Sequence, residues 1–162
     1  MSAAAAYRFR PMTAADLPLV RSWLATPDVA AWRETPEAID EAALAELDTA
    51  LWIVSHQGRP FAYIQDYDPH AWPGHHFAFL PPGSRGVDQC IGESDMIGQG
   101  HGSAFIRAHV DRLFAEGSPA VGTDPDPRNA RAIRAYEKAG FVRGEARDTE
   151  WGFSLLMTRY AK

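Results

Sequence analysis

Hydrophobic residues recur along this chain with two periods, which together predict a protein of mixed helices and strands. Alternating apolar and polar residues over short runs predict strands, and apolar residues three or four positions apart predict helices. In chain order the predicted elements are a strand at 7–10, helices at 13–25 and 35–47, strands at 51–54, 61–67 and 87–92, a helix at 103–116, a strand at 120–123, a helix at 126–139, and strands at 141–146 and 151–160.

Capping residues support the two helices predicted in the first third of the chain. Thr13 and Asp16 have the spacing of a capping box, and Pro18 removes an early hydrogen bond, so we expect an irregular first turn. Thr35 is a typical cap, and Pro36 after it suits the first helical position. The apolar faces are expected to hold Leu17, Val20 and Leu24 in the first helix and Ile39, Ala43 and Leu47 in the second.

The order of these elements predicts one mixed sheet. The strands at 51–54 and 61–67 flank a turn with glycine and proline and are expected to form an antiparallel hairpin. The strand, helix and strand between 87 and 123 imply a parallel crossover. We therefore predict an α/β protein of mixed α+β character, with about seven strands, helices on both faces of the sheet, and a single domain over residues 1–162.

Residues 68–86 interrupt the regular pattern with four prolines and three glycines. A loop of this length is usually functional or disordered, and its aromatic residues favour order. We interpret the neighbouring His75 and His76 as surface polarity. No cysteine or carboxylate lies at convincing zinc-ligand spacing from them, so we expect no metal site.

Three glycines, Gly98, Gly100 and Gly102, alternate immediately before the predicted helix at 103–116. A loop with so few side chains lets backbone N–H groups approach a bulky ligand, and at a helix N-terminus these groups have no intrahelical partner. Phosphate or pyrophosphate suits such a site. The alternative is a plain glycine-rich turn. The spacing matches neither a P-loop, which ends in Gly-Lys-Ser/Thr, nor the G-x-G-x-x-G dinucleotide pattern.

Length and composition indicate one globular domain. The chain has 162 residues and a single cysteine, Cys90, which allows no internal disulfide and favours a reducing compartment. No segment reaches transmembrane length, and we interpret residues 1–6 as a loose tail rather than a signal peptide. We therefore expect a cytoplasmic protein with no membrane partner.

Charge is distributed unevenly along the chain. Residues 1–96 carry 13 acidic and 6 basic groups, whereas residues 97–143 carry 7 basic and 5 acidic groups. This split suits an anionic cofactor beside the basic segment and a cationic substrate beside the acidic one. Solvated helix faces are the alternative interpretation. The net charge of -5 argues against a nucleic-acid partner.

Two blocks of the sequence resemble the Gcn5-related N-acetyltransferase (GNAT) superfamily. Gly100 and Gly102 occupy the glycine positions of its pyrophosphate loop, Gln/Arg-x-x-Gly-x-Gly/Ala, although Ile97 stands at the first position. Residues 129–141 are closely similar to its more specific signature N-x-x-A-x-x-x-Y-E-K-x-G-F. A narrower likeness, from about residue 59 to 141, is to the aminoglycoside 6′-N-acetyltransferases, and rests on residues 85–89 and 123–129.

The resemblance implies acetyl-CoA as the cofactor. Its pyrophosphate would lie over the backbone amides of residues 99–103, and its pantetheine along the strand at 87–91, with Asn129 bonding the pantetheine. Arg128, Arg131, Arg134 and Lys138 are candidates for the 3′-phosphate. The implied cofactor-binding residues are Gln89, Cys90, Ile91, Gln99, Gly100, His101, Gly102, Ser103, Asn129, Arg134, Tyr136 and Lys138.

Two side chains are candidates for proton transfer. An amine must lose a proton before it attacks, since its pKa is ~10. Asp88 lies on the strand before the cofactor loop and is expected to meet the amine, either as a base or as an anchor that passes the proton to water. A backbone N–H of the same strand would stabilise the oxyanion. The resemblance implies that Tyr136 donates a proton to the leaving thiolate; the alternative is a core aromatic residue.

Further residues are expected to build the acceptor pocket. Asp124 ends the strand that should splay from the one carrying Asp88, and ligands bind where strand ends part. It is either a second anion for the acceptor or a turn residue before Pro125. Other candidates for substrate binding are Tyr67, Trp72 and Glu93, while Trp23 and Trp32 either line the pocket or belong to the core.

Acetyl transfer to a polycationic amine, above all the 6′-amine of an aminoglycoside, is therefore the leading expectation, as in an antibiotic-resistance enzyme. Transfer to another amine, such as a siderophore precursor, a polyamine or a protein N-terminus, is an alternative. A non-catalytic acyl-CoA-binding module is another, although Asp88 and Tyr136 argue against it. A monomer or a homodimer is expected.

Overall fold

A computed structural model describes residues 6–32 and 39–162 of the chain. It contains seven strands, β1 (Tyr7–Pro11), β2 (Thr49–His56), β3 (Arg59–Tyr67), β4 (Arg85–Ile91), β5 (Ala120–Thr123), β6 (Val142–Thr149) and β7 (Gly152–Tyr160). The α-helices are α2 (Leu17–Leu24), α3 (Pro27–Ala30), α4 (Glu41–Leu44), α5 (His101–Ala115) and α6 (Ala130–Lys138), and short 3-10 turns cover Ala14–Asp16, Pro69–Ala71 and Ser94–Met96.

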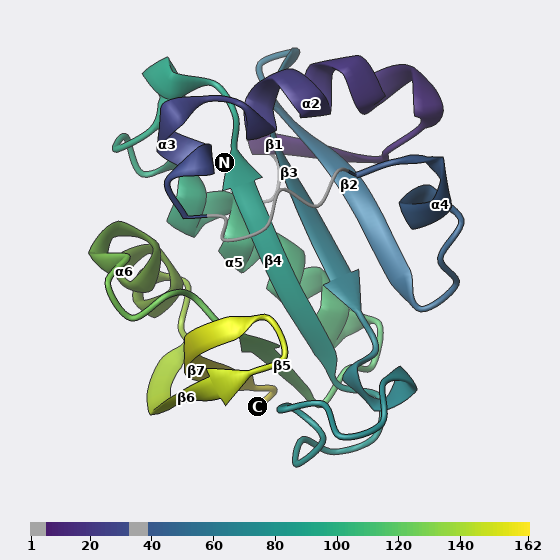
Figure 1. The fold of residues 1–162 in the computed structure, drawn as a ribbon, viewed down its shortest axis with the longest axis vertical. Coiled ribbons are helices and arrows are strands. Elements are labelled where there is room, and N and C mark those ends of the chain that lie inside the picture. The colour runs from purple at the N-terminus through teal and green to yellow at the C-terminus, as the bar shows by residue number, and fades with distance from the viewer. Residues whose placement is uncertain (1–5, 33–38) are drawn as a thin grey trace.

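All seven strands form one mixed sheet in the order β1-β2-β3-β4-β5-β7-β6 (Figure 1). Neighbouring strands are antiparallel except β4 and β5, which are parallel and connected through α5. The predicted fold class, the β2–β3 hairpin and the parallel crossover are confirmed. The first strand and the last hairpin belong to the same sheet, so both ends of the chain contribute to it.

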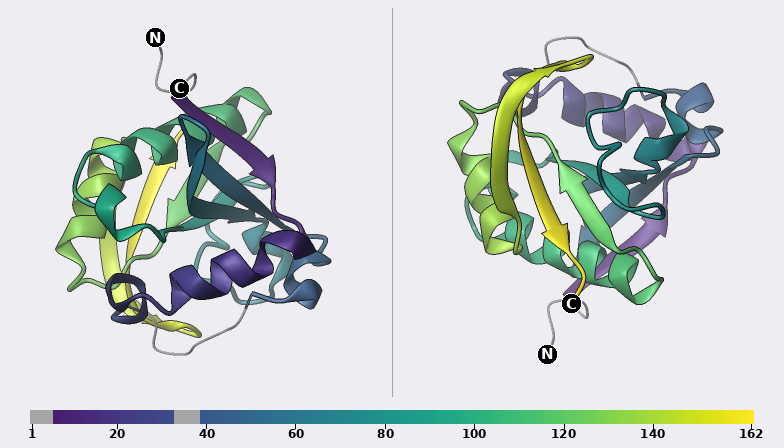
Figure 2. Two further views of the ribbon diagram at one scale, coloured as in Figure 1. Left: turned by 90° about the horizontal axis from the view of Figure 1, so that it is seen from above. Right: turned by 90° about the horizontal axis from the view of Figure 1, so that it is seen from below.

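Helices cover both faces of the sheet, as Figure 2 shows from above and from below. On one face, α5 and α6 pack against β2 to β5 and β7 in the largest hydrophobic cluster, which includes Phe105, Ile106 and Val110. On the other face, α2 covers β2 to β4 through a second cluster that includes Val20, Trp23 and Ile53. Trp23 is therefore a core residue, and its ring lies so close to Gly92 that a Cβ there would clash with it.

The capping box at Thr13 and Asp16 is present, and the first turn is a 3-10 turn that precedes α2, as Pro18 led us to expect. The predicted helix at 35–47 is wrong in extent: among the described residues only Glu41–Leu44 is helical. Thr35 and Pro36 lie outside the described residues. Leu47 is 97% exposed rather than on an apolar face, because the chain turns there into β2.

Two other helix starts differ from the prediction. α5 begins at His101, two residues early, with Gly100 as its N-cap in a left-handed conformation (φ 87°) that glycine adopts at little cost. α6 begins at Ala130 rather than near Pro127, because the Asn129 side chain accepts a hydrogen bond from the Ala132 N–H and caps the helix.

The long loop before β4 takes the place of a helix over the β5 and β7 end of the sheet. Phe77 and Leu80 pack on Ala120 and Leu156 in a third cluster. The ring of Phe77 lies where a side chain at Gly122 would be. The loop is thus ordered by burial of its aromatic residues, and it carries His75 and His76 into the interior.

The interpretation of His75 and His76 as surface polarity is therefore wrong. Their residues are only 6% and 7% exposed, and their rings stack at 4.1 Å. Within residues 6–32 and 39–162, no helix is long and apolar enough to cross a membrane.

Candidate active site

The site is a cleft that opens where β4 and β5 separate. These parallel strands pair only through Arg85 with Val121 and Gly86 with Gly122. Beyond that point the Thr123 hydroxyl still donates to the Val87 carbonyl at 3.0 Å, and then the strands diverge. The resulting cleft has a volume of about 740 Å³ and runs from α3 and α4 to α6 and Trp151. Ligands of open α/β sheets bind at such a parting of strand ends.

One part of the cleft wall is suited to a phosphate-rich ligand. Gly98, Gly100, Gly102 and Ser103 line it at the start of α5, and Gly100 provides no side-chain cap, so the first N–H groups of the helix are open to a ligand. Opposite them, α6 contributes a row of basic side chains from Arg131, Arg134 and Lys138. The predicted residues Gln89, Cys90, Ile91, Asn129 and Tyr136 also line the cleft.

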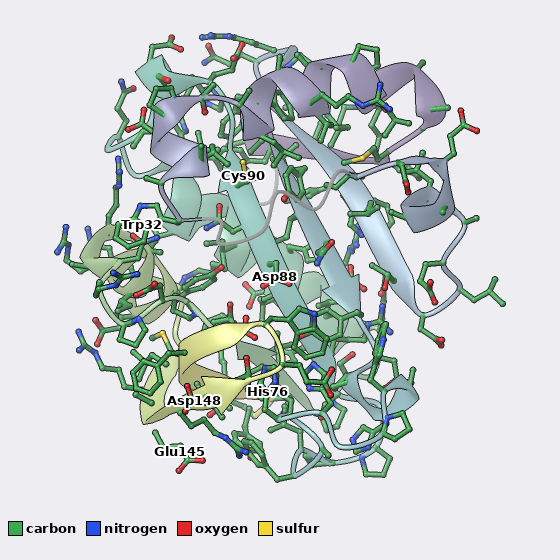
Figure 3. All side chains as sticks on the ribbon, viewed as in Figure 1. Trp32, His76, Asp88, Cys90, Glu145 and Asp148 are labelled. Carbon is green, nitrogen blue, oxygen red and sulfur yellow. The ribbon has the colours of Figure 1, made fainter. Side chains whose placement is uncertain are left out.

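Two carboxylates occupy the middle of the cleft. Asp88 lies halfway along β4, as Figure 3 shows, and Asp124 follows β5 across the gap. Gln65, opposite Asp88 on β3, donates to its Oδ2 at 2.9 Å. His76 from the long loop contacts Asp124 Oδ2 through Nε2 at 2.7 Å. The two carboxyl groups lie within hydrogen-bonding reach of each other, so they can share one proton.

Burial raises the pKa of both carboxyl groups. The pKa of Asp88 rises to about 7, first because of desolvation and then because of the neighbouring Asp124, while Gln65 opposes the shift. Desolvation raises the pKa of Asp124 to about 6, and the bond to Asp88 opposes it. Two interacting acids titrate as a pair, so this pair loses its last proton near neutral pH, where a general base is most effective.

Tyr136 projects from α6 to the same point of the cleft. Its ring packs edge-on against Phe141 with 5.5 Å between centroids, which accounts for its place in the core. The side chains of Thr123 and Gln89 lie beside its hydroxyl, and both oppose the rise in its pKa. Burial raises the pKa of Tyr136 well above its usual value, and the charge of Asp88 adds to this, so the hydroxyl keeps its proton and is a donor at neutral pH.

Three residues predicted to bind the substrate are not part of the cleft wall, and two predicted cofactor residues direct their side chains away from it. Tyr67, Trp72 and Glu93 do not line the cleft: Glu93 pairs with Arg59 at 3.5 Å, and Tyr67 is buried against Gly86 and Trp72. Tyr67 nevertheless lies close behind the wall, since burial and then the charges of Asp88 and Asp124 raise its pKa. The side chain of Gln99 bonds the Asp95 carbonyl at 2.6 Å, and that of His101 bonds the Tyr7 hydroxyl at 2.8 Å. The side chains of these two loop residues turn away, so only their backbone is available to a ligand.

The sequence interpretation missed four residues that surround the acceptor end of the cleft. Gln65 was detectable, since pairing of β3 with β4 places it opposite Asp88. His76, Thr123 and Trp151 carried no such signal, because they come from a loop, a short strand and a turn brought together by the fold. Trp32, by contrast, does line the cleft, which was one of the two alternatives that the sequence left open for it.

The side chains that line the cleft can bind an anion and transfer protons. No group of three or more His, Cys, Asp or Glu side chains in the described part of the chain has a metal-binding arrangement. The cleft instead combines an anion site of backbone N–H groups and basic side chains with a proton-sharing carboxylate pair and a tyrosine donor.

The chain is similar to known acetyltransferases in sequence. Residues 12–149 match the family model described as an acetyltransferase (GNAT) domain. An aminoglycoside N(6′)-acetyltransferase type 1 of Klebsiella pneumoniae is 33% identical, over 93% of this chain and 81% of that protein. A kanamycin resistance protein of Rhizobium radiobacter is 42% identical, over 48% of this chain and 73% of that protein.

Solved structures agree with this relationship. The aminoglycoside acetyltransferase AAC(6′)-Ib in complex with coenzyme A has a TM-score of 0.86 and 31% identity, over 95% of this chain and 94% of that one. Its complex with coenzyme A and kanamycin has a TM-score of 0.85, with the same identity and coverage. The sheet, the glycine loop and the α6 signature together form the cleft described above. Because the family model also spans most of the chain, this chain belongs to the GNAT acetyltransferase family.

Proposed function

We propose that this protein transfers the acetyl group of acetyl-CoA to a primary amine of an aminoglycoside, the 6′-amine in particular. The observation that carries this proposal is the Asp88–Asp124 pair, which places negative charge and a proton acceptor in the same cleft as the glycine loop. The names of the relatives, aminoglycoside N(6′)-acetyltransferase and kanamycin resistance protein, support the same substrate class.

Acetyl-CoA would supply a thioester, whose acyl carbon an amine can attack. The residues present fit this cofactor: the open N–H groups at the start of α5 suit its pyrophosphate, and Arg131, Arg134 and Lys138 suit its 3′-phosphate. The edge of β4 beyond Val87 is not paired with β5, so its backbone can pair with an extended pantetheine as a neighbouring strand would.

The residues of the chain then divide the proton transfers between them. Asp88 takes a proton from the acceptor ammonium, with Asp124 as the second anion that attracts the cation. A backbone N–H of β4 near Asp88 stabilises the oxyanion that forms as the amine attacks. Tyr136, which keeps its proton at neutral pH, donates it to the leaving thiolate.

The test is an acetylation assay with the purified protein, acetyl-CoA and matched acceptors, in which the free thiol released from the cofactor measures turnover. We expect turnover with kanamycin-type aminoglycosides and loss of turnover when the 6′-amine is replaced by a hydroxyl. Mass spectrometry and NMR of the product would locate the acetyl group. Turnover confined to polyamines, siderophore precursors or peptides would instead identify one of those amines, and binding of acetyl-CoA without any turnover would indicate a binding module.

A further inference from the structure

His76 completes a continuous chain of polar side chains that leads away from the acceptor position. Gln65 donates to Asp88, Asp88 faces Asp124 across the gap, and Asp124 contacts His76 Nε2 at 2.7 Å. These residues come from β3, β4, the end of β5 and the long loop, so no local sequence feature produces the arrangement. In Figure 3, His76 lies beside the β6–β7 hairpin, below Asp88.

The surroundings of His76 hold its ring in one place. Its side chain is 3% exposed, and the ring packs on His75 at 4.1 Å and on Phe77 at 4.7 Å. Trp151, which also lines the cleft, covers it from the β6–β7 turn with 5.7 Å between centroids. The charged and titratable groups that face His76 from the packed elements are Asp88, Asp124, His75, Arg147 and Glu150.

We propose that His76 is a positioning residue for the acetylation, which acts through Asp124 by taking up the proton that the acceptor amine loses. This proposal rests on the proposed function. The ammonium gives one proton to an Asp88 oxygen, Asp88 passes a proton to Asp124, and Asp124 passes one to Nε2 of a neutral ring whose own proton is on Nδ1. No electrons are exchanged, and the carboxylate pair is left with the charge it had before the reaction.

Burial sets the charge states from which this path begins. Burial lowers the pKa of His76, and Arg147 adds to this shift while Asp88 and Glu150 oppose it, so the ring is neutral at neutral pH and its free nitrogen can accept a proton. Burial raises the pKa values of Asp88 and Asp124 to about 7 and about 6. The geometric basis for transfer is the 2.7 Å separation between Asp124 Oδ2 and His76 Nε2, which is a hydrogen-bond distance.

Replacement of His76 by Gln separates a relay from a structural role. The Gln amide still donates a hydrogen bond to Asp124 but takes up no proton. We expect kcat for the aminoglycoside to fall by about tenfold or more, while KM for the acceptor and the affinity for acetyl-CoA stay within about twofold. His75→Gln is the matched control, because His75 is equally buried and stacked but its Nδ1 accepts from the Phe77 N–H rather than contacting a carboxylate; we expect its kcat to stay within about twofold.

A second measurement does not depend on turnover. NMR titration of the His76 ring in the free protein should show a pKa that falls further in Asp124→Asn, because the carboxylate that favours the charged ring is gone. Wild-type kcat in a folded His76→Gln protein, or an unchanged His76 pKa in Asp124→Asn, would overturn the proposal. Failure of the wild-type protein to acetylate any amine would instead refute the proposed function, and the NMR comparison would still decide whether His76 and Asp124 are coupled.

Discussion

At the scale of single residues, the chemistry of this protein depends on how burial changes two carboxyl groups. An exposed aspartate has a pKa of ~3.9 and is a poor base. Asp88 has a pKa of about 7 because it is desolvated in the cleft and faces Asp124. The same residue type on the surface behaves in the opposite way: at Asp95, the bond from Arg59 lowers the pKa. Position in the cleft therefore makes Asp88 suitable for proton transfer.

Asp88→Asn should remove the proton acceptor with little change in shape. We expect kcat/KM for the acceptor to fall by about a hundredfold to ten-thousandfold, the usual range for a positioned general base. In the wild type, kcat/KM should rise as the pH increases through about 7, because Asp88 must lose its proton to act. Rate measurements from pH 5.5 to 8.5 should show this rise in the wild type and its loss in Asp88→Asn.

Stability and a second variant serve as controls for Asp88→Asn. A carboxyl group with a raised pKa lowers stability once the pH exceeds its unfolded value, so Asn at position 88 should melt at or above the wild-type temperature at pH 8. Tyr136→Phe should lower kcat but keep the rise of rate with pH, since Asp88 is still present. An Asp88→Asn enzyme with the wild-type rate would remove Asp88 from the mechanism.

At the scale of elements, the start of α5 combines a backbone anion site with a lack of side chains. Gly102 is the second residue of the helix and lines the cleft. A Cβ built there meets only Ile91 at 3.6 Å and Ala135 at 3.8 Å, which are ordinary contact distances. A larger side chain at this position therefore occupies cleft space without straining the fold.

Gly102→Val should consequently weaken acetyl-CoA binding in a folded protein. We expect the dissociation constant to rise by at least about tenfold, or about 1.4 kcal/mol, with an unchanged melting temperature. Calorimetric titration measures the first quantity. Gly58→Ala is the control with the opposite expectation, a loss of stability without a loss of binding. The φ of 81° at Gly58 disfavours any side chain, so this substitution should cost about 1–2 kcal/mol of stability and leave binding unchanged. Equal affinity in Gly102→Val would remove the loop from the cofactor site.

At the scale of the whole molecule, a buried charged network joins the sheet to α5. Asp66 on β3 accepts hydrogen bonds from Arg85 at 2.6 Å, from Trp52 at 2.9 Å and from His109 of α5, whose Nε2 lies 2.8 Å away. Asp66 and His109 are 3% and 1% exposed. The partners lower the pKa of Asp66 despite its burial, whereas burial lowers the pKa of His109 despite Asp66.

This network should make stability depend on pH. The pKa of His109 in the folded protein is below its ordinary 6.5, so the unfolded chain takes up a proton first as the pH falls. The destabilising effect of His109 is therefore absent above pH 6.5, and the free energy of unfolding decreases as the pH falls below that value. His109→Gln keeps a donor for Asp66 but does not titrate, so its melting temperature should fall less than that of the wild type between pH 7.5 and 5.

Part of this decrease should remain in His109→Gln, because burial also lowers the pKa of His75 and of His76. Asp66→Asn is the companion variant. It leaves Arg85 without its buried partner and should cost about 3–5 kcal/mol at neutral pH, measured by denaturant unfolding. Identical pH dependence in His109→Gln and the wild type would show that His109 has no such role.

Much of this molecule is determined by local sequence. The alternation along β1, the short apolar runs of β2 and β3 and the apolar stripes of α2 and α5 are local sequence patterns, so these elements were predictable. The glycine loop and the residues of α6 were predictable for a related reason, because a ligand that binds backbone N–H groups and a row of basic side chains leaves a contiguous pattern. The short helix at Glu41–Leu44 was predicted too long, since periodicity does not show where the chain turns.

Only the tertiary structure decided the acceptor end of the cleft. Asp88 was identified from its strand, but its raised pKa comes first from burial and then from Asp124. His76 is buried beside them because Phe77 and Leu80 anchor a loop that has no regular pattern. Tyr67, Trp72 and Glu93 carried suitable chemistry yet lie outside the cleft wall. Local sequence specifies which backbone shape a segment prefers, whereas burial, charge coupling and contacts between distant segments exist only after the chain has folded.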